Sequence, residues 1–348
     1  MSAPPSPWRR VLGQDRAKEL FLSTLERERL AHAYLLTGPD GVGKTLFAVE
    51  LAALLLCRDK KRRGCGECPD CRMVEGDRHP DLILIEAEEG KQDIGIKQVQ
   101  EVVIPFLTLM PVQGERRIVV LREAERLNDE SGNALLKTLE EPAPFGILLL
   151  TCARPHTLLS TIRSRCQEVR FDRLTPDQVR RILADHPEID DAVAAQAARF
   201  SGGSAGQAIE MIENGSLQKY GETIPAVTGL PKTDPFDLAD DLADWTRAKG
   251  KESESGKAEV GREALRDYLR LLSLAYRDLT LLRFGAAPET LCQEDARGRW
   301  AALAAKLSAD RLIRIEEAIW EARRRVDANA SAQFVLQEMF DGIAQLQG

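Results

Sequence analysis

The sequence lacks a run of apolar residues long enough to cross a membrane. A helix that spans a bilayer needs about 20 mostly apolar residues, whereas the longest run here, residues 51–57, reaches roughly a third of that length. The amino terminus, MSAPPSPWRR, also lacks the apolar core of a secretory signal. We therefore expect a cytoplasmic protein.

The sequence also lacks an excess of positive charge and any evident internal repeat. Its 348 residues carry a formal net charge of −7, whereas a protein that binds DNA unaided is more often basic. Two interpretations remain open: the chain contacts no nucleic acid, or its contact with DNA is local or shared with partners. The length favours two or three domains over one small core.

Strands and helices alternate over roughly the first 150 residues. Short apolar runs bounded by glycine or proline predict buried strands, and helical periodicity separates them. This alternation predicts an α/β domain with a parallel sheet. The predicted strands are residues 33–37, 81–85, 117–121 and 147–151, and the predicted helices are residues 14–30, 46–56, 99–109 and 131–140.

After residue 172 the pattern is helical, with predicted helices over residues 175–184, 189–200 and 205–213. Residues 220–236 contain three prolines and two glycines, which predicts a hinge or linker. The polar stretch 249–259 predicts a mobile loop. We therefore predict three domains, over residues 1–172, 173–216 and 217–348.

Residues 38–45, GPDGVGKT, fit the phosphate-loop pattern G-x-x-x-x-G-K-[ST] in full. Glycines let the backbone turn its N–H groups toward a phosphate, and the following helix adds its positive N-terminal dipole. Lys44 can reach the β- and γ-phosphates, and the Thr45 hydroxyl can hold Mg²⁺. The pattern predicts binding of ATP or ADP with Mg²⁺; the alternative is a loop that keeps its fold and binds no nucleotide. The predicted nucleotide-binding residues are Gly38, Gly41, Gly43, Lys44 and Thr45.

The strand at residues 117–121 is followed by an unusual pair of residues. A phosphate-loop ATPase places a magnesium-binding Asp there, usually with a Glu beside it. This chain has Arg122 and Glu123 instead, so a cation occupies the magnesium position and Glu123 occupies that of the catalytic glutamate. We expect little or no hydrolysis at this site. A shift of one residue in register would instead allow Glu123 to serve magnesium.

Four of the seven cysteines, Cys57, Cys65, Cys68 and Cys71, follow the spacing C-x₇-C-x₂-C-x₂-C. In a cytoplasmic chain this favours metal binding over disulfides, and four thiolates form the tetrahedral cage that Zn²⁺ prefers. We predict a structural zinc site without a catalytic role; free thiols and a redox disulfide are the alternatives. The adjacent basic run, residues 60–63, is equally consistent with a solvated loop and with DNA contact.

Five segments in order resemble the bacterial clamp-loader subunits of the AAA+ class over roughly residues 8–172. They are the phosphate loop, the cysteine insert (57–71), His79-Pro80-Asp81, the decapeptide NALLKTLEEP (133–142) and Ser164-Arg165-Cys166. The resemblance implies an α/β AAA+ P-loop domain, then a small helical lid and a C-terminal all-α collar that holds a ring of subunits together. It also implies that Arg165 acts in trans as an arginine finger on a neighbour's ATP. The residues alone would not assign that role, because most arginines are simply surface residues.

Two departures within this family resemble its delta′ type. The ATPase members carry an acidic pair where this chain has Arg122-Glu123, and a sensor arginine where it has Gly206. The resemblance thus implies a subunit of the DNA polymerase III clamp loader with little ATPase activity of its own. The implied partners are gamma/tau-type ATPase subunits, the delta subunit and, through the complex, the sliding clamp and primer–template DNA.

Two other functions remain as hypotheses. An active gamma/tau-type ATPase would lose the turnover of its complex on Lys44→Ala, and Arg122 and Gly206 argue against it. A zinc-stabilised DNA-binding module outside replication would bind DNA tightly on its own, with a steep dependence on salt. The acidic charge balance argues against that module.

Overall fold

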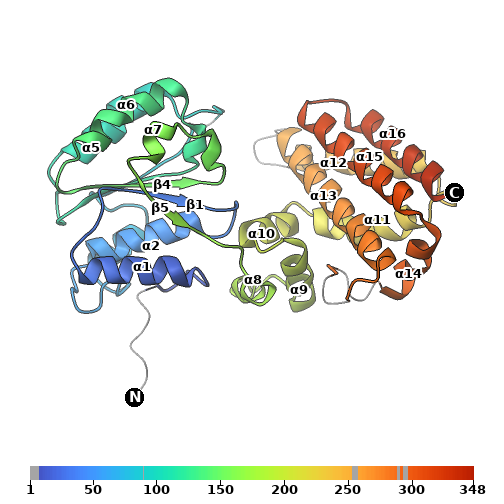
Figure 1. Cartoon of the computed structure of the whole chain (residues 1–348), viewed down its shortest axis with the longest axis horizontal. Helices are drawn as coiled ribbons and strands as arrows, with labels where there is room; N and C mark the ends of the chain where they lie inside the picture. The colour runs from blue at the N-terminus through green and yellow to red at the C-terminus, as the bar shows by residue number, and fades with distance from the viewer. Residues whose placement is uncertain (1–7, 89, 253–257, 288–290, 293–296) are drawn as a thin grey trace, which may run out of the picture. The chain divides into compact units, whose positions relative to one another are not determined.

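The computed structural model describes residues 8–88, 90–252, 258–287, 291–292 and 297–348. The chain forms two compact units, Met1–Gln178 and Val179–Gly348 (Figure 1). The first contains the sheet, and the described part of the second is helical. The predicted fold class, a parallel α/β domain followed by helices, is confirmed. The further division into a lid (173–216) and a collar (217–348) stays a prediction.

Five parallel strands form one sheet in the order β2-β3-β4-β1-β5. Every residue of β1, β3 and β4 is buried, which explains their nearly continuous apolar sequences. The four predicted strands are therefore present. The strands are β1 (Ala33–Thr37), β2 (Leu82–Ile85), β3 (Arg117–Leu121), β4 (Gly146–Cys152) and β5 (Gln167–Arg170).

The fifth strand, β5, is an addition to the predicted set. It pairs with β1 at the edge of the sheet, and Val169 is its one buried residue. Its sequence, Gln-Glu-Val-Arg, contains no apolar run, so the pattern of apolar residues does not reveal it.

Helices cover both faces of the sheet (Figure 1). Alternate residues of β1 point to opposite faces: Tyr34 and Leu36 belong to a core with α1 and α2, and Ala33 and Leu35 belong to a core with α6 and the helical stretch before it. The helices on the first face are α1 (Asp15–Glu26) and α2 (Lys44–Leu56), with the short α3 (Pro69–Glu75) packed against α2. Those on the second are α4 (Ile96–Gln98), a π-helical turn (Val99–Val103), α5 (Ile104–Thr108), α6 (Asp129–Glu140) and α7 (Ser160–Arg163).

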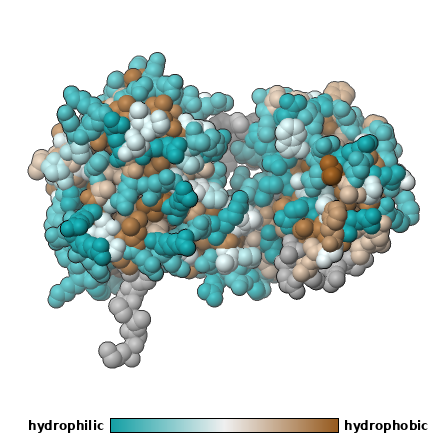
Figure 2. Space-filling view, in the orientation of Figure 1, coloured by the Kyte–Doolittle hydropathy of each residue, from teal (hydrophilic) through white to brown (hydrophobic). Residues whose placement is uncertain are grey.

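The second unit begins within α8 and continues as a succession of helices, of which α12, α13, α15 and α16 pack on one another. None of the helices in the described ranges combines the length and apolar composition that a membrane crossing requires. The face drawn in Figure 2 is mostly hydrophilic, with scattered apolar side chains. The helices are α8 (Pro176–Leu183), α9 (Asp191–Phe200), α10 (Ala205–Glu213), α11 (Ser216–Thr228), α12 (Pro235–Glu252), α13 (Ala258–Arg283), α14 (Arg297–Lys306), α15 (Ala309–Asp327) and α16 (Ala332–Gln347).

The prediction of a linker over residues 220–236 is wrong for residues 220–228, which lie inside α11. Pro225 sits within that helix, where it removes one backbone hydrogen bond at a cost of about 3 kcal/mol. Tyr220 and Val227 are fully buried, and their burial offsets the proline. Of the predicted loop at 249–259, the first residues belong to α12 and the last to α13, and residues 253–257 lie outside the described ranges.

A buried carboxylate, Asp81, joins the start of β2 to the loop before β3. It accepts backbone N–H bonds from Val112 (2.7 Å), Gln113 (2.8 Å) and Gly114 (2.8 Å), and Arg117 lies 3.5 Å away. Burial alone would raise the pKa of Asp81, but the three amides and Arg117 outweigh it and hold the pKa below its usual value. The ionised form of Asp81 therefore stabilises the fold.

We expect Asp81→Asn to lower the free energy of unfolding by about 3 kcal/mol at pH 7. The neutral amide loses charge-assisted bonds and leaves Arg117 without its counter-charge. Because the folded-state pKa is lowered, the stabilisation is fully present above the unfolded pKa and is lost as the pH falls through the folded pKa. Urea unfolding should therefore show the difference from the wild type shrinking below about pH 4.

The control for this experiment is Asp93→Asn, since Asp93 is exposed. It should change the unfolding free energy by less than about 0.5 kcal/mol. Equal losses in the two variants would show that the Asp81 carboxylate does not stabilise the fold.

Candidate functional site

The predicted site segments gather at one edge of the sheet. Because all five strands are parallel, their carboxyl ends meet there: β1 leads into the phosphate loop, β3 leads to Arg122, and β4 ends at Cys152. Ligands of open α/β sheets bind outside the carboxyl ends of the strands. This edge is the candidate nucleotide site.

The phosphate loop depends on glycine at three positions. Gly38, Gly41 and Gly43 have φ angles of 149°, 70° and 97°, which side chains rarely allow. A Cβ on Gly38 would lie 2.4 Å from the carbonyl oxygen of Phe171, just beyond β5. The Gly38 N–H donates to the carbonyl of Cys152 at 3.2 Å. The start of the loop is therefore fixed between β4 and the end of β5.

Lys44, the first residue of α2, is only 7% exposed. Its Nζ donates to the carbonyl oxygens of Gly38 and Pro39, both at 2.7 Å, and lies 3.8 Å from Asp40 Oδ1. Burial lowers the pKa of Lys44, while nearby carboxylates, Asp40 first, oppose that shift. Since an ammonium group has three donors, one remains for a phosphate oxygen.

Gln14, which the sequence did not single out, connects the phosphate loop to the end of β5. Its side-chain amide donates to the carbonyls of Val42 (3.3 Å) and Asp172 (2.8 Å), and its side-chain oxygen accepts the Asp172 N–H (3.0 Å). Gln14 also lines a cavity of about 370 Å³ with Arg170 and Leu174. An isolated glutamine has no chemical signature in a sequence, so only the fold reveals this position.

Arg122 faces away from the phosphate loop. Strand β3 lies between β2 and β4, and the Arg122 guanidinium donates to Glu86 Oε2 at 2.6 Å, one residue beyond β2. Glu123 follows with a left-handed φ of 50°, and its carboxylate lies 2.6 Å from Arg126 Nε. The cation at position 122 therefore points to the β2 side, whereas β1 and its loop lie on the other side of β4.

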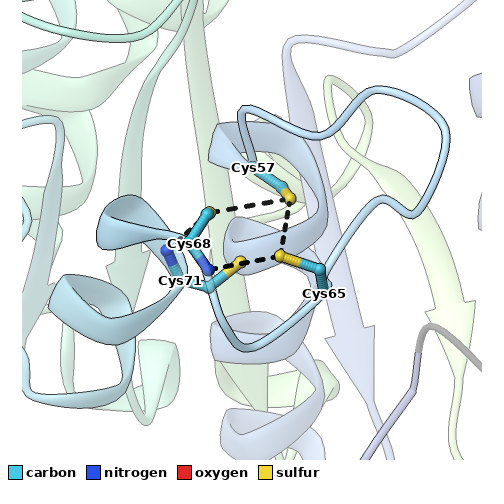
Figure 3. A group of neighbouring side chains, drawn as sticks. All are labelled: Cys57, Cys65, Cys68 and Cys71. Carbon is cyan, nitrogen blue, oxygen red and sulfur yellow. Dashed lines mark hydrogen bonds between the residues drawn. The ribbon is translucent and has the colours of Figure 1, made fainter.

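The four predicted metal ligands come together between α2 and α3 (Figure 3). The four sulfur atoms all lie within 4.8 Å of one another, with Cys57 Sγ 3.7 Å from Cys65 Sγ and 3.8 Å from Cys68 Sγ. Cys68 also caps α3, because its sulfur accepts the N–H of Cys71 at 3.4 Å. This cluster could hold a metal ion.

The thiols of the cluster differ in how readily they ionise. Burial raises the pKa of Cys57 and Cys71. Burial also acts to raise that of Cys68, but N–H donors from Cys71 and Arg58 outweigh it and lower the pKa to about 7. A thiolate is thus available near neutral pH at Cys68, and a bound cation would favour the thiolate forms of Cys57 and Cys71.

A second layer of side chains attaches the cysteine loop to the sheet. Asp70 is buried and accepts bonds from Arg58 Nε (2.5 Å) and Nη2 (3.2 Å). Its Oδ1 lies 3.6 Å from His79 Nε2, and His79 Nδ1 accepts the N–H of Asp81 at 3.0 Å. Through these contacts the His79-Pro80-Asp81 segment lies next to the cysteine loop.

Two of the basic residues beside the cysteines have acidic partners within the chain. Lys60 pairs with Glu115 at 3.2 Å, and Arg62 pairs with Asp59 at 2.8 Å and with Glu67 at 3.4 Å. Their charges are therefore partly neutralised, which favours the solvated-loop interpretation of residues 60–63.

Arg165 lies at the surface, two residues after the end of α7, and contacts the decapeptide segment. Its Nη2 bonds Glu140 Oε1 at 2.5 Å, at the end of α6, and its Nη1 donates to the carbonyl of Thr161 at 3.0 Å. The side chain of Arg165 is 34% exposed and that of Glu140 is 52% exposed. Two of the segments that carried the resemblance therefore touch through an ion pair.

Known proteins resemble this chain most clearly in its first half. The family described as "DNA polymerase III, delta subunit" matches residues 13–175. DNA polymerase III subunit delta′ of Pseudomonas aeruginosa is 44% identical over 141 residues, and that of Bacillus subtilis is 25% identical over 336 residues, 94% of each chain. Over the matched residues, the chain is similar to DNA polymerase III delta′ subunits.

The Pseudomonas match covers 40% of this chain and 43% of the relative, so the strong identity is confined to part of each protein. A solved structure of a DNA polymerase III gamma subunit-related protein from Thermotoga maritima overlays with a TM-score of 0.40 at 17% identity, and covers 94% of this chain and 99% of that one. The matched family region contains every nucleotide, cysteine and arginine position described above.

We expect the purified chain to carry one equivalent of metal, held by the four cysteines. Cys68→Ser should remove it, because a structural tetrathiolate site needs all four ligands. Cys292→Ser is the matched control, since Cys292 lies in the helical unit and outside the cluster. Elemental analysis by mass spectrometry checks this, and a full equivalent retained by Cys68→Ser would contradict the tetrathiolate site.

Proposed function

We propose that the chain is the delta′ subunit of a bacterial DNA polymerase III clamp loader and helps to load the sliding clamp onto primed DNA. In this role it supplies Arg165 in trans to the ATP of a neighbouring gamma/tau-type subunit. The delta subunit is a further partner, and the clamp and primer–template DNA are contacted through the complex. The observation that carries this proposal is Arg165 itself, a surface guanidinium held in one place by Glu140.

The ion pair with Glu140 suits a residue that acts on another subunit. Glu140 neutralises and orients the guanidinium at the surface while no phosphate is near it. A γ-phosphate carries more charge than a carboxylate and offers the same bidentate geometry, so it can take the place of Glu140. An arginine that meets a γ-phosphate in the transition state is worth roughly 10³–10⁵ in rate.

The phosphate loop fits a nucleotide with its magnesium ion. Three positive-φ glycines orient the backbone, Lys44 keeps a donor free, and Thr45 follows it at the start of α2. The cavity beside Gln14 has room for a base and ribose, and the Gln14 side chain connects it to the loop through its bond to Val42. When bound, magnesium would neutralise phosphate charge. We propose that ATP or ADP binds here through Gly38, Gly41, Gly43, Lys44 and Thr45.

We further propose that hydrolysis at this site is weak or absent. Arg122 pairs with Glu86 and offers no ligand for magnesium, and the Glu123 carboxylate pairs with Arg126. Neither residue is therefore placed to activate a water molecule. The metal of the cysteine cluster is Zn²⁺ in this proposal, because a set of four thiolates suits zinc, and its role is structural.

The test is a reconstituted loader with clamp and primed DNA, in which this chain alone is varied. Arg165→Ala should lower ATP turnover by roughly 10³-fold, because the neighbour's transition-state charge loses its partner. Arg163→Ala, which removes an exposed arginine two residues earlier, should leave turnover unchanged. Lys44→Ala should have little effect on turnover.

Two results would contradict the proposal. Equal turnover in Arg165→Ala and Arg163→Ala would remove the finger role. A large loss of ATP turnover with Lys44→Ala would mean that this chain hydrolyses ATP itself, as an active gamma/tau-type subunit does. Arg122 would then not prevent hydrolysis at this site.

Glu140→Gln tests whether the ion pair positions the finger. The amide keeps an acceptor but loses the charge that holds the guanidinium, so turnover of the same loader should fall by about 10-fold, with the ATP dissociation constant unchanged. Glu141→Gln is the matched control, because Glu141 is an exposed carboxylate one residue later. If the two glutamine variants behave alike, Glu140 does not position Arg165.

A further inference from the structure

An acidic side chain other than Glu123 turns back toward the phosphate loop. After Arg122 has turned to the β2 side, the left-handed residue Glu123 reverses the chain, and a 3₁₀ turn follows (Ala124–Arg126). Within that turn, Glu125 Oε1 accepts the N–H of Ala153 at 3.0 Å, directly after β4. Residues 122 and 125 therefore lie on opposite sides of β3.

The end of β4 adjoins the phosphate loop. Cys152, the last residue of β4, is in register with Thr37, the last residue of β1. Its carbonyl also accepts the N–H of Gly38 at 3.2 Å, the first residue of the loop. The Glu125 carboxylate is thus bonded to the residue next to the one that fixes the start of the phosphate loop.

One oxygen of this carboxylate has no partner. Glu125 Oε2 is buried and accepts no hydrogen bond within the described part of the chain, although leaving a buried charged acceptor unpaired is costly. The Cys152 thiol is beside this carboxylate: burial, followed by the charge of Glu125 and a contact of the thiol with it, raises the pKa of Cys152 to about 12. The thiol therefore stays protonated, and an S–H group is only a weak donor. Lys44 feels the same carboxylate, since Glu125 is among the groups that oppose the lowering of its pKa, ahead of Glu123, which acts in the same direction more weakly. Glu125 Oε2 is therefore available to coordinate a cation at the phosphate loop.

We propose that Glu125, in place of residue 122, supplies the carboxylate toward the Mg²⁺ ion of a nucleotide bound at the phosphate loop. Magnesium keeps several waters and is usually bound by one or two carboxylates together with the phosphates. A single carboxylate, with the hydroxyl of Thr45, therefore completes the set. The inference rests on the nucleotide binding proposed above.

This arrangement separates binding from hydrolysis. The Glu125 carboxylate supplies negative charge to bind the metal. Glu123 stays paired with Arg126, so the site has no general base to activate a water molecule. A site of this kind holds a magnesium nucleotide without turning it over, which suits a subunit whose contribution to catalysis lies at Arg165.

The experiment measures nucleotide affinity of the full-length chain by calorimetry, for ATP and ADP, each with Mg²⁺ and with EDTA. In the wild type, Mg²⁺ should tighten binding. Glu125→Gln should remove roughly 10–100-fold of that gain and leave the affinity in EDTA unchanged. Glu123→Gln is the matched control and should behave as the wild type, because Glu123 faces Arg126.

A second readout is independent of affinity. With Mn²⁺ in place of Mg²⁺, the electron paramagnetic resonance spectrum of the bound nucleotide complex should change in Glu125→Gln and not in Glu123→Gln. Circular dichroism checks the fold of each variant. Should the buried amide of Glu125→Gln prevent folding, Glu125→Ser removes the carboxylate without adding an amide and gives the same comparison.

Each of the following results would overturn the assignment of Glu125 to the magnesium ion. If Glu125→Gln keeps the full Mg²⁺-dependent gain, or if the wild type binds equally well in EDTA, the inference is overturned while nucleotide binding stands. Loss of the gain in Glu123→Gln alone would assign the metal to that residue instead. If the wild type binds no nucleotide under either condition, the nucleotide part of the proposed function fails and the inference falls with it.

Discussion

The parallel direction of all five strands is the constraint on which the rest of the site depends. It brings every segment that leaves a carboxyl end to one edge of the sheet, so the phosphate loop, the segment after β3 and the end of β4 become neighbours although they are far apart in the sequence. The order of the strands then decides which neighbour a side chain meets. A residue that follows β3 can turn toward β2 or toward β4. Arg122 turns toward β2 and pairs with Glu86, whereas Glu125 turns toward β4 and accepts the N–H of Ala153.

Much of this architecture could be predicted from local sequence. Buried parallel strands are nearly continuous apolar runs, so four of them could be located, and the cysteine spacing alone indicated a cluster that the structure brings within 4.8 Å. The failures have a common cause, which is that tertiary contacts override local signals. Strand β5 is polar because it lies at an edge, and Pro225 sits in a helix because its neighbours are buried. The direction of Arg122 and the role of Gln14 depend on contacts that no spacing encodes.

The sequence motifs also turn out to be contact pairs. The decapeptide and the Ser164-Arg165-Cys166 segment meet through Glu140 and Arg165. The cysteine insert and the segment around His79 meet through Asp70. The order of such motifs along the chain can be read from the sequence, but their positions relative to one another in space cannot. Their contacts give a physical reason for their presence together: Glu140 and Arg165 form an ion pair, and Asp70 and His79 lie side by side in the interior.

The contact between Asp70 and His79 has a consequence for protein engineering. The cysteine loop is joined to β2 by side chains that lie outside the loop, with His79 held in turn by the backbone of Asp81. A transplant limited to residues 57–71 would therefore leave Asp70 facing whatever the recipient has in place of His79. The natural unit for grafting this cysteine cluster into another protein is the longer stretch that ends at Asp81, together with the loop whose amides Asp81 binds.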